Sequence, residues 1–269
     1  MDTSLLIEQQ KRAEYAQPVC KALRRFRFKG TSSYSRLEFK RAWLQRLAYI
    51  HALCRRSDIH SVNDVFTKIN RSLSSQWQLR HVKTCVDAIG RFLEIDDRAI
   101  SSRAQLTRLK GYCKHAILAS AETLERMVTH EFDGTQCARA RERPVEQPDG
   151  SIDVAIRQCR PESIQCTVHN FFELHKQDFK AIARHAEEMD KASDELKKLA
   201  QHTRLALKDP VHLCDDRNCR RLADALIAVD GKDMEVYAAN NDREWGPIAT
   251  VMKKPLLNPV TGERHDSQR

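Results

Sequence analysis

Apolar residues recur every three or four positions along most of this chain, which is the spacing of one face of an α-helix. The pattern is clearest over residues 35–56, SRLEFKRAWLQRLAYIHALCRR, where one face carries Phe39, Trp43, Leu47, Ile50 and Cys54. Basic residues occupy the other faces, and Ser35 stands where an N-cap belongs. We therefore expect an amphipathic helix here, with its apolar face against a core.

The same periodicity predicts helices over 61–73, 75–95 and 102–132, and one long helix over 170–207 that Lys208-Asp209-Pro210 ends. Residues 133–168 differ because Gly and Pro interrupt them, and a short strand is predicted at SIDVAIRQC (151–159). The remaining pattern predicts a helix over 215–229, a short strand over 234–239, a loop and helix over 240–254, and a mostly irregular tail.

Composition agrees with a globular protein weighted toward helix. Of the 269 residues, 41% are hydrophobic and 31% charged, with 8 Gly and 8 Pro, which argues against disorder. The length suffices for one large domain or for a domain with a second module. The chain lacks both an apolar run near the roughly 18 residues of a membrane span and a secretion signal, so we expect a cytoplasmic protein that is not bound to a membrane.

The charge favours a polyanionic partner. The formal net charge is +9 and the pI is near 9.1. Basic surface gains free energy by releasing counterions from phosphate backbones, so nucleic acid is the leading candidate, and a solubilising surface is the alternative. In KALRRFRFKG, basic residues alternate with Phe26 and Phe28, which suits phosphate contact and base stacking; these are Arg24, Arg25, Arg27 and Lys29. An edge strand with its charges in solvent explains the same pattern.

Nine cysteines, an odd count, favour reduced thiols over a disulfide framework in a chain without a signal peptide. HLCDDRNC brings His212, Cys214 and Cys219 close together, but no second ligand pair follows at zinc-finger spacing. Structural zinc is therefore the weaker interpretation of this segment.

One acidic residue stands in an unusual setting. Asp224 lies in a segment that is apolar nearly all round, and a helix of that kind is buried. A buried carboxylate must be paired, protonated or bound to a metal. An ion pair with Arg220 or Arg221, one turn earlier, is the alternative to a metal.

Three other acidic stretches each have an ordinary explanation. Glu38 completes a capping box S-x-x-E with Ser35. AANNDREW (238–245) follows a predicted strand and is compatible with an Asn-rich turn before a capped helix. Asp2, next to a terminus, would ordinarily be solvated.

Taken in order, however, four stretches resemble the motifs of the PIN-domain nucleases. They are DTSLLI (2–7), SSYSRLEFKRAW (32–43), CRRLADALIAVDG (219–231) and VYAANNDREWGPIA (236–249). In that family an Asp follows the first strand, a Glu opens an early helix, another Asp lies in a D-A-L-I-A helix, and a further acid or amide follows the next strand. The match covers roughly residues 1–60 and 208–252.

The resemblance implies a site residue by residue. It places Asp2, Glu38, Asp224 and Asp242 in one acidic, catalytic cluster that holds a divalent metal. Thr3 or Ser4 would supply the hydroxyl that accompanies the first Asp, and Glu244 would be accessory. A two-residue slip of the alignment would put Asn240 in the place of Asp242.

The resemblance also implies an α/β fold: a small, PIN-like parallel sheet flanked by helices, with a large helical insertion that makes the chain mostly α overall. The nuclease domain would be discontinuous, over 1–69 and 208–255, with the helical insertion at 70–207 and an irregular tail at 256–269. In the family the first Asp ends a central strand, whereas only Met1 precedes Asp2. Either translation begins upstream or the innermost strand is missing.

Asp and Glu oxygens suit Mg²⁺ or Mn²⁺. We therefore expect a Mg²⁺- or Mn²⁺-dependent endonuclease that hydrolyses phosphodiester bonds, and the family resemblance favours RNA as its substrate. Arg41 and the other basic residues named above would bind the nucleic-acid strand. A toxin or phage-defence role and a regulatory protein partner also follow from the family alone. The alternative is a non-catalytic helical module that binds nucleic acid or protein.

Overall fold

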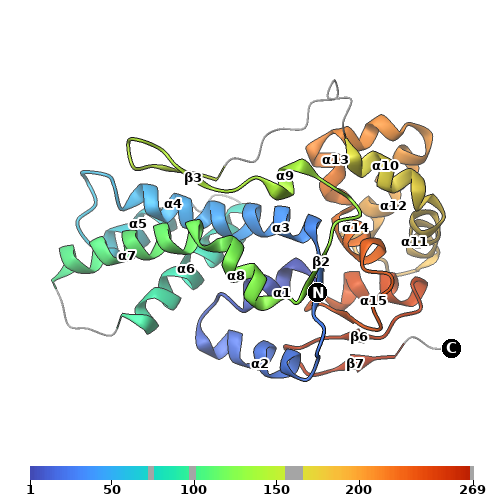
Figure 1. Ribbon diagram of the computed structural model, residues 1–269, viewed down its shortest axis with the longest axis horizontal. Helices are drawn as coiled ribbons and strands as arrows, with labels where there is room; N and C mark the ends of the chain where they lie inside the picture. Colours follow the sequence, from blue (N-terminus) through green and yellow to red (C-terminus); the bar gives the residue numbers. More distant parts are fainter. Residues whose placement is uncertain (72–75, 97–100, 155–165, 267–269) are drawn as a thin grey trace.

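The computed structural model describes residues 1–71, 76–96, 101–154 and 166–266, and these are mostly helical (Figure 1). In the first half of the chain the helices are α1 (Thr3–Glu8), α2 (Ala13–Arg24), α3 (Ser33–Phe39), the π-helical turn η1 (Lys40–Leu44), α4 (Gln45–Leu53), α5 (Val62–Arg71), α6 (Gln76–Ile95), α7 (Ser102–Leu118) and α8 (Ser120–Met127). In the second half they are α9 (Ala138–Arg141), α10 (Thr167–Leu174), α11 (Lys176–Glu188), α12 (Asp194–Lys208), the 3₁₀ turn η2 (Pro210–Cys214), α13 (Asp216–Arg221), α14 (Ala223–Asp230) and α15 (Asp242–Val251).

The strands are short and form small sheets. They are β1 (Gly30–Ser32), β2 (His130–Phe132), β3 (Val145–Glu146), β4 (Ile152–Asp153), β5 (Tyr237–Ala238), β6 (Leu256–Leu257) and β7 (Arg264–His265). β1 pairs with β2 and β5 pairs with β6, both in parallel, while β3–β4 and β6–β7 are antiparallel. The parallel pairs place distant parts of the chain side by side.

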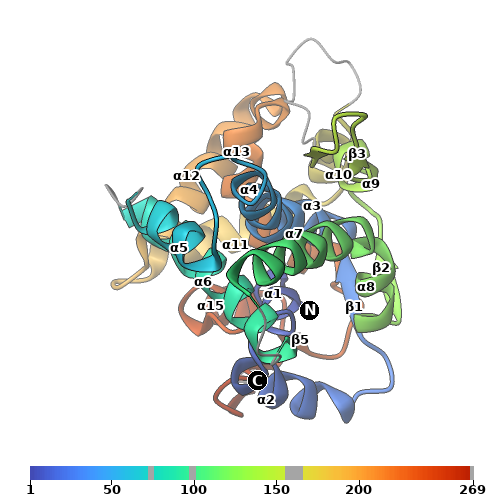
Figure 2. The same cartoon turned by 90° about the vertical axis from the view of Figure 1, so that its left-hand side faces the viewer.

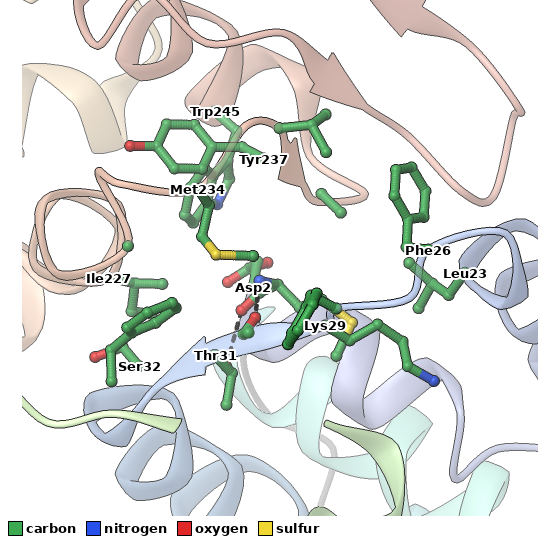
Figure 3. Close-up of a pocket in the computed structure, with 17 residues that line it drawn as sticks. Asp2, Leu23, Phe26, Lys29, Thr31, Ser32, Ile227, Met234, Tyr237 and Trp245 are labelled. Carbon is green, nitrogen blue, oxygen red and sulfur yellow. Dashed lines mark hydrogen bonds between the residues drawn. The ribbon is translucent and has the colours of Figure 1, made fainter. Parts of the chain in front are cut away.

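The first two residues lie between the two parallel pairs. The Met1 amine donates to the carbonyl oxygen of Gly30 over 2.6 Å, and the Thr31 hydroxyl donates to the carbonyl of Met1 over 2.9 Å. On the other side, the Asp2 amide donates to the carbonyl of Ala238 over 2.9 Å. Asp2 accordingly lies between Thr31 on one side and Tyr237 and Trp245 on the other (Figure 3).

Two main clusters of buried apolar side chains form the core. One is built by α4 to α8 and includes Trp43, and the other is built by α10 to α15 and includes Trp245. Helix α3 joins them, because Tyr34 packs into the second cluster and Phe39 into the first. The helices of the two clusters lie at opposite ends of the long axis in Figure 1, with α3 between them. Figure 2 views the molecule from the side of the first cluster, where α4 and α7 lie together.

Residues 70–207, the predicted insertion, contribute to both clusters. Helices α6 to α8 pack with α4 and α5, whereas α10 to α12 pack with α13 to α15. The side chains of the predicted insertion are therefore shared between two cores, each of which also contains residues from outside that range.

Several predicted boundaries differ in the structure. The single helix expected over 170–207 is three helices: His175 caps the end of α10, and after α11 a turn at 190–191 leads to Ser193, which caps α12 through the Leu196 amide. The helix expected over 215–229 is interrupted at Leu222, between α13 and α14. The predicted irregular tail contains β6 and β7, and the strand predicted at 151–159 is described at β4, while 155–159 lie outside the described residues.

The helix that carries Glu38 begins earlier than predicted. Ser32, not Ser35, is its N-cap, and the Ser32 hydroxyl accepts from the Tyr34 amide over 3.1 Å. Ser35 is buried inside the helix, so the capping box between Ser35 and Glu38 is wrong. The Glu38 carboxylate is thereby available for other contacts. Directly after it, α3 continues into the π-helical turn η1, a distortion that recurs at functional sites.

Candidate metal centre

Asp2 is buried in spite of its place in the sequence. It is 5% exposed and is the N-cap of α1, where it accepts hydrogen bonds from the Ser4 amide, over 3.2 Å, and from the Ser4 hydroxyl. Its own amide is held by Ala238, as described above. Burial raises the pKa of Asp2, while the hydrogen bonds from Ser4 lower it. The expected solvated terminus is therefore replaced by a fixed carboxylate.

Glu38 lies close to Asp2. Its Oε2 accepts from the Thr3 hydroxyl over 3.3 Å, so the N-terminus of α1, which Asp2 caps, lies against Glu38 of α3. Burial, followed by the negative charge of Asp2, raises the pKa of Glu38 to about 7. The guanidinium of Arg41 opposes this rise but is outweighed.

Asp224 is the third carboxylate of the cluster. It is the second residue of α14, in which six of eight residues are buried. Burial raises the pKa of Asp224 well above its usual value, and the charges of Asp2, Glu38 and Glu244 raise it further. A hydrogen bond from the Trp245 side chain lowers it. Four carboxylates from four separate segments therefore converge.

The predicted ion pair of Asp224 is replaced by other contacts. The guanidinium of Arg221 is 3.0 Å from the Oε2 of Glu195, on α12. Arg220 is exposed and acts on Glu38, whose pKa it lowers slightly. Among the described residues, the groups that act on the Asp224 carboxylate are chiefly acidic.

The structure assigns Glu244, not Asp242, to this cluster. The Oδ2 of Asp242 accepts from the Asn258 side chain over 3.0 Å and is 3.8 Å from the Nε2 of His265. Residues two apart on a helix point about 200° apart. Asp242 and Glu244 accordingly flank opposite sides of the buried face of α15 that carries Trp245, and Glu244 is on the side of Asp224.

An open cavity of about 320 Å³ gives access to the acids, and its lining includes Glu38, Asp224 and Glu244. Asn241 also lines it, whereas Asn240, the predicted alternative to Asp242, does not. Of the two predicted hydroxyl residues, Thr3 contacts Glu38 and Ser4 contacts Asp2.

The predicted basic segment is not a strand. Arg24 ends α2, and residues 25–29 form an irregular connection to β1. The guanidiniums of Arg25 and Arg27 lie over the rings of Phe26 and Phe28, at 5.2 and 5.9 Å from the ring centroids. Phe26, Phe28 and Lys29 border a cavity of about 50 Å³ that also includes Met1 and Asp2 (Figure 3). The exposed arginine–aromatic pairs keep the expected pattern without the strand.

Arg41, the fifth predicted basic residue, is 9% exposed and lies beside Glu38. It forms an ion pair with Asp216, and Arg139 forms a second ion pair with the same carboxylate. A buried guanidinium next to a carboxylate cluster partly offsets the mutual repulsion of the acids.

Two other groups of side chains contain metal-ligand types. Asp242, Glu263 and His265 offer ligand atoms within 4.8 Å of one another, but Glu263 and His265 are well exposed. The zinc alternative is not supported where the chain is described. His212 stacks on His202 and its ring contacts Asn218, and the thiol of Cys219 contacts the hydroxyl of Tyr34.

The cluster of Asp2, Glu38, Asp224 and Glu244 has the chemistry that a hard divalent cation requires, although among the described residues only Asp242, Glu263 and His265 bring three ligand atoms within 4.8 Å of one another. Its donors are all carboxylate oxygens, the set that Mg²⁺ and Mn²⁺ prefer. Burial is the largest cause of the raised pKa values of Asp2, Glu38 and Asp224, and the charges of neighbouring acids raise the pKa values of Glu38 and Asp224 further. A bound cation would offset the cost of burying these charges, so we expect a cation held here to stabilise the fold.

Comparisons with protein-family models, with curated proteins and with solved structures find no match to this chain. No helix in the described ranges is long and apolar enough to cross a membrane.

Proposed function

We propose that this protein is a Mg²⁺- or Mn²⁺-dependent nuclease that hydrolyses phosphodiester bonds, with RNA as the favoured substrate. The observation that carries the proposal is that the charges of Asp2, Glu38 and Glu244 act on Asp224, and that Glu38, Asp224 and Glu244 line one cavity. Carboxylates in a cleft whose pKa values are perturbed by burial and by specific charged neighbours are candidates for a functional site.

The arrangement of the strands supports the PIN-like interpretation. In that family the first Asp follows a central strand, and here Met1 and Asp2 are hydrogen-bonded to β1 on one side and to β5 on the other. Both β1–β2 and β5–β6 are parallel. The spatial order of these segments is β2, β1, residues 1–2, β5 and β6. Asp2 therefore lies in the central segment of this order.

In this proposal Asp2, Asp224 and Glu244 hold the cation, and Glu38 orients the attacking water or completes the ligand set. When bound, the cation would supply positive charge to the scissile phosphate and lower the pKa of the water. Without a cation the pKa of Glu38 is raised to about 7, and a bound cation would lower it, so Glu38 would be ionised near neutral pH and able to accept a proton from the attacking water. Arg41 and Arg220 lie beside Glu38 and are suited to attract the phosphate backbone.

The test is a cleavage assay with end-labelled single-stranded RNA and DNA of matched sequence. We expect cleavage with Mg²⁺ or Mn²⁺ and complete loss in EDTA, with RNA cut faster than DNA. Recovery of activity when Mn²⁺ is added back would exclude irreversible damage by the chelator. Binding of both nucleic acids without any product, at every metal concentration, would instead support a non-catalytic binding protein.

A further inference from the structure

A second cavity, of about 260 Å³, adjoins the acidic cluster, and three arginines are among its eight lining residues. Its lining includes Arg41, Arg46, His81 and Arg220. Glu38 and Arg220 border both this cavity and the acidic one, so the two are neighbours. In this way residues of α4, α6 and α13, which are far apart in the sequence, meet next to the candidate metal centre.

The arginines of this cavity differ in how far their positive charge is neutralised by a partner. Arg41 is paired with Asp216, as described above. The guanidinium of Arg46, by contrast, contacts the Nε2 of His81 over 3.0 Å, and burial lowers the pKa of Arg46. Burial and the charges of Arg46 and Arg220 lower the pKa of His81 to about 4, so this ring is neutral near pH 7. The His81 ring is therefore a neutral partner of Arg46, and this contact does not neutralise the positive charge of Arg46.

We propose that this basic cavity binds a phosphate group of the nucleic-acid strand, next to the phosphodiester that lies at the acidic cluster. The inference rests on the proposed nuclease function and adds the substrate-binding subsite. Guanidiniums present forked donors that match phosphate oxygens. The cavity is smaller than the sites that enclose whole small molecules, which suits a phosphate and its immediate attachments.

The subsite also gives a role to helix α6, which lies within the predicted insertion. His81 supports Arg46 from α6, and Thr84 of the same helix lines the cavity. The insertion would then take part directly in substrate binding, since one wall of the phosphate site belongs to it. The phosphate could be internal or a 5′-terminal monoester, and these two sources are separated by experiment.

The test measures binding without cleavage, so that it remains informative if the nuclease proposal fails. Single-stranded RNA with a 3′ fluorescent label, with either a 5′-phosphate or a 5′-hydroxyl, is titrated by fluorescence anisotropy in EDTA. We expect Arg46→Ala to weaken binding about tenfold and to lower the slope of log affinity against log salt by about 0.7, the value of one phosphate contact on a single strand. Arg204→Ala is the matched control, because Arg204 is exposed on α12, pairs with Glu187 and changes the net charge equally.

Weaker binding of both RNAs identifies an internal phosphate, and weaker binding of the 5′-phosphorylated RNA alone identifies a terminal one. Either result supports the subsite. If Arg46→Ala does not fold, Arg220→Ala replaces it, because Arg220 is exposed and tolerates truncation. Binding by the folded variant that equals that of Arg204→Ala overturns the inference. Loss of binding by Arg46→Ala in a protein that never cleaves RNA would reject the nuclease and retain the phosphate subsite.

Discussion

Asp224→Asn is expected to reduce metal-dependent cleavage by at least about 100-fold, on the scale that loss of one transition-state-stabilising group typically costs. The carboxylate lies on α14, and burial, followed by the charges of Asp2, Glu38 and Glu244, raises its pKa. An amide keeps the size of the side chain and the hydrogen bond from Trp245 but removes the charge that holds the cation. Initial rates with saturating Mn²⁺ measure the effect.

The comparison variant is Asp242→Asn. It removes a charge from the same region, but this carboxylate contacts Asn258 and His265. We expect its cleavage rate to stay within a factor of about three of the wild type, since no metal ligand is lost. Equal losses in the two variants would show that the fourth motif supplies Asp242 to the site after all.

The second large effect that we expect is a pH dependence of the stability of the metal-free protein. The pKa of Glu38 is raised to about 7 from 4.5, so between these values the folded protein binds more protons than the unfolded chain. The free energy of unfolding without metal must then fall as pH rises through this window. The raised pKa values of Asp2 and Asp224 act in the same direction. We expect the metal-free Tm to decrease between about pH 5 and about pH 8.

A divalent cation reverses this dependence, because it competes with the protons for the same oxygens. At about 100 times its Kd the cation stabilises the protein by about 2.7 kcal/mol, which corresponds to a Tm rise of roughly 5–10 °C. We expect this rise to be small near pH 5.5 and full near pH 8. Thermal unfolding in EDTA and in Mg²⁺ measures both effects, and Glu38→Gln should flatten the metal-free curve. A Tm that rises with pH in EDTA would contradict the account.

The sequence allowed much of the helical framework and part of the site to be predicted. The apolar periodicity of residues 35–56 located α3 and α4, and the apolar surroundings of Asp224 indicated a buried carboxylate with an unusual role. Both are local properties, since helical spacing and composition carry them. The placement of Asp2 and Glu38 near Asp224 came from the family resemblance, because the pairing of distant segments leaves no periodic signal.

The other differences between the predictions and the structure share one physical cause. In each, the local sequence suits two alternatives almost equally well. Ser32 and Ser35 are both suitable caps, and the pairing of β1 with β2 decided for Ser32. Asp242 and Glu244 flank the buried face of α15 equally well, and only the position of α14 determines which one meets Asp224. The short strand β6 forms because Leu256 and Leu257 pair with β5, which the tail sequence alone does not indicate.

The most direct test of the central claim is the location of Mn²⁺ in crystals of the wild-type protein, determined by its anomalous scattering. The account predicts a peak among the carboxylates of Asp2, Asp224 and Glu244, within reach of Glu38. A peak confined to Asp242, Glu263 and His265, or none at millimolar Mn²⁺, would contradict it.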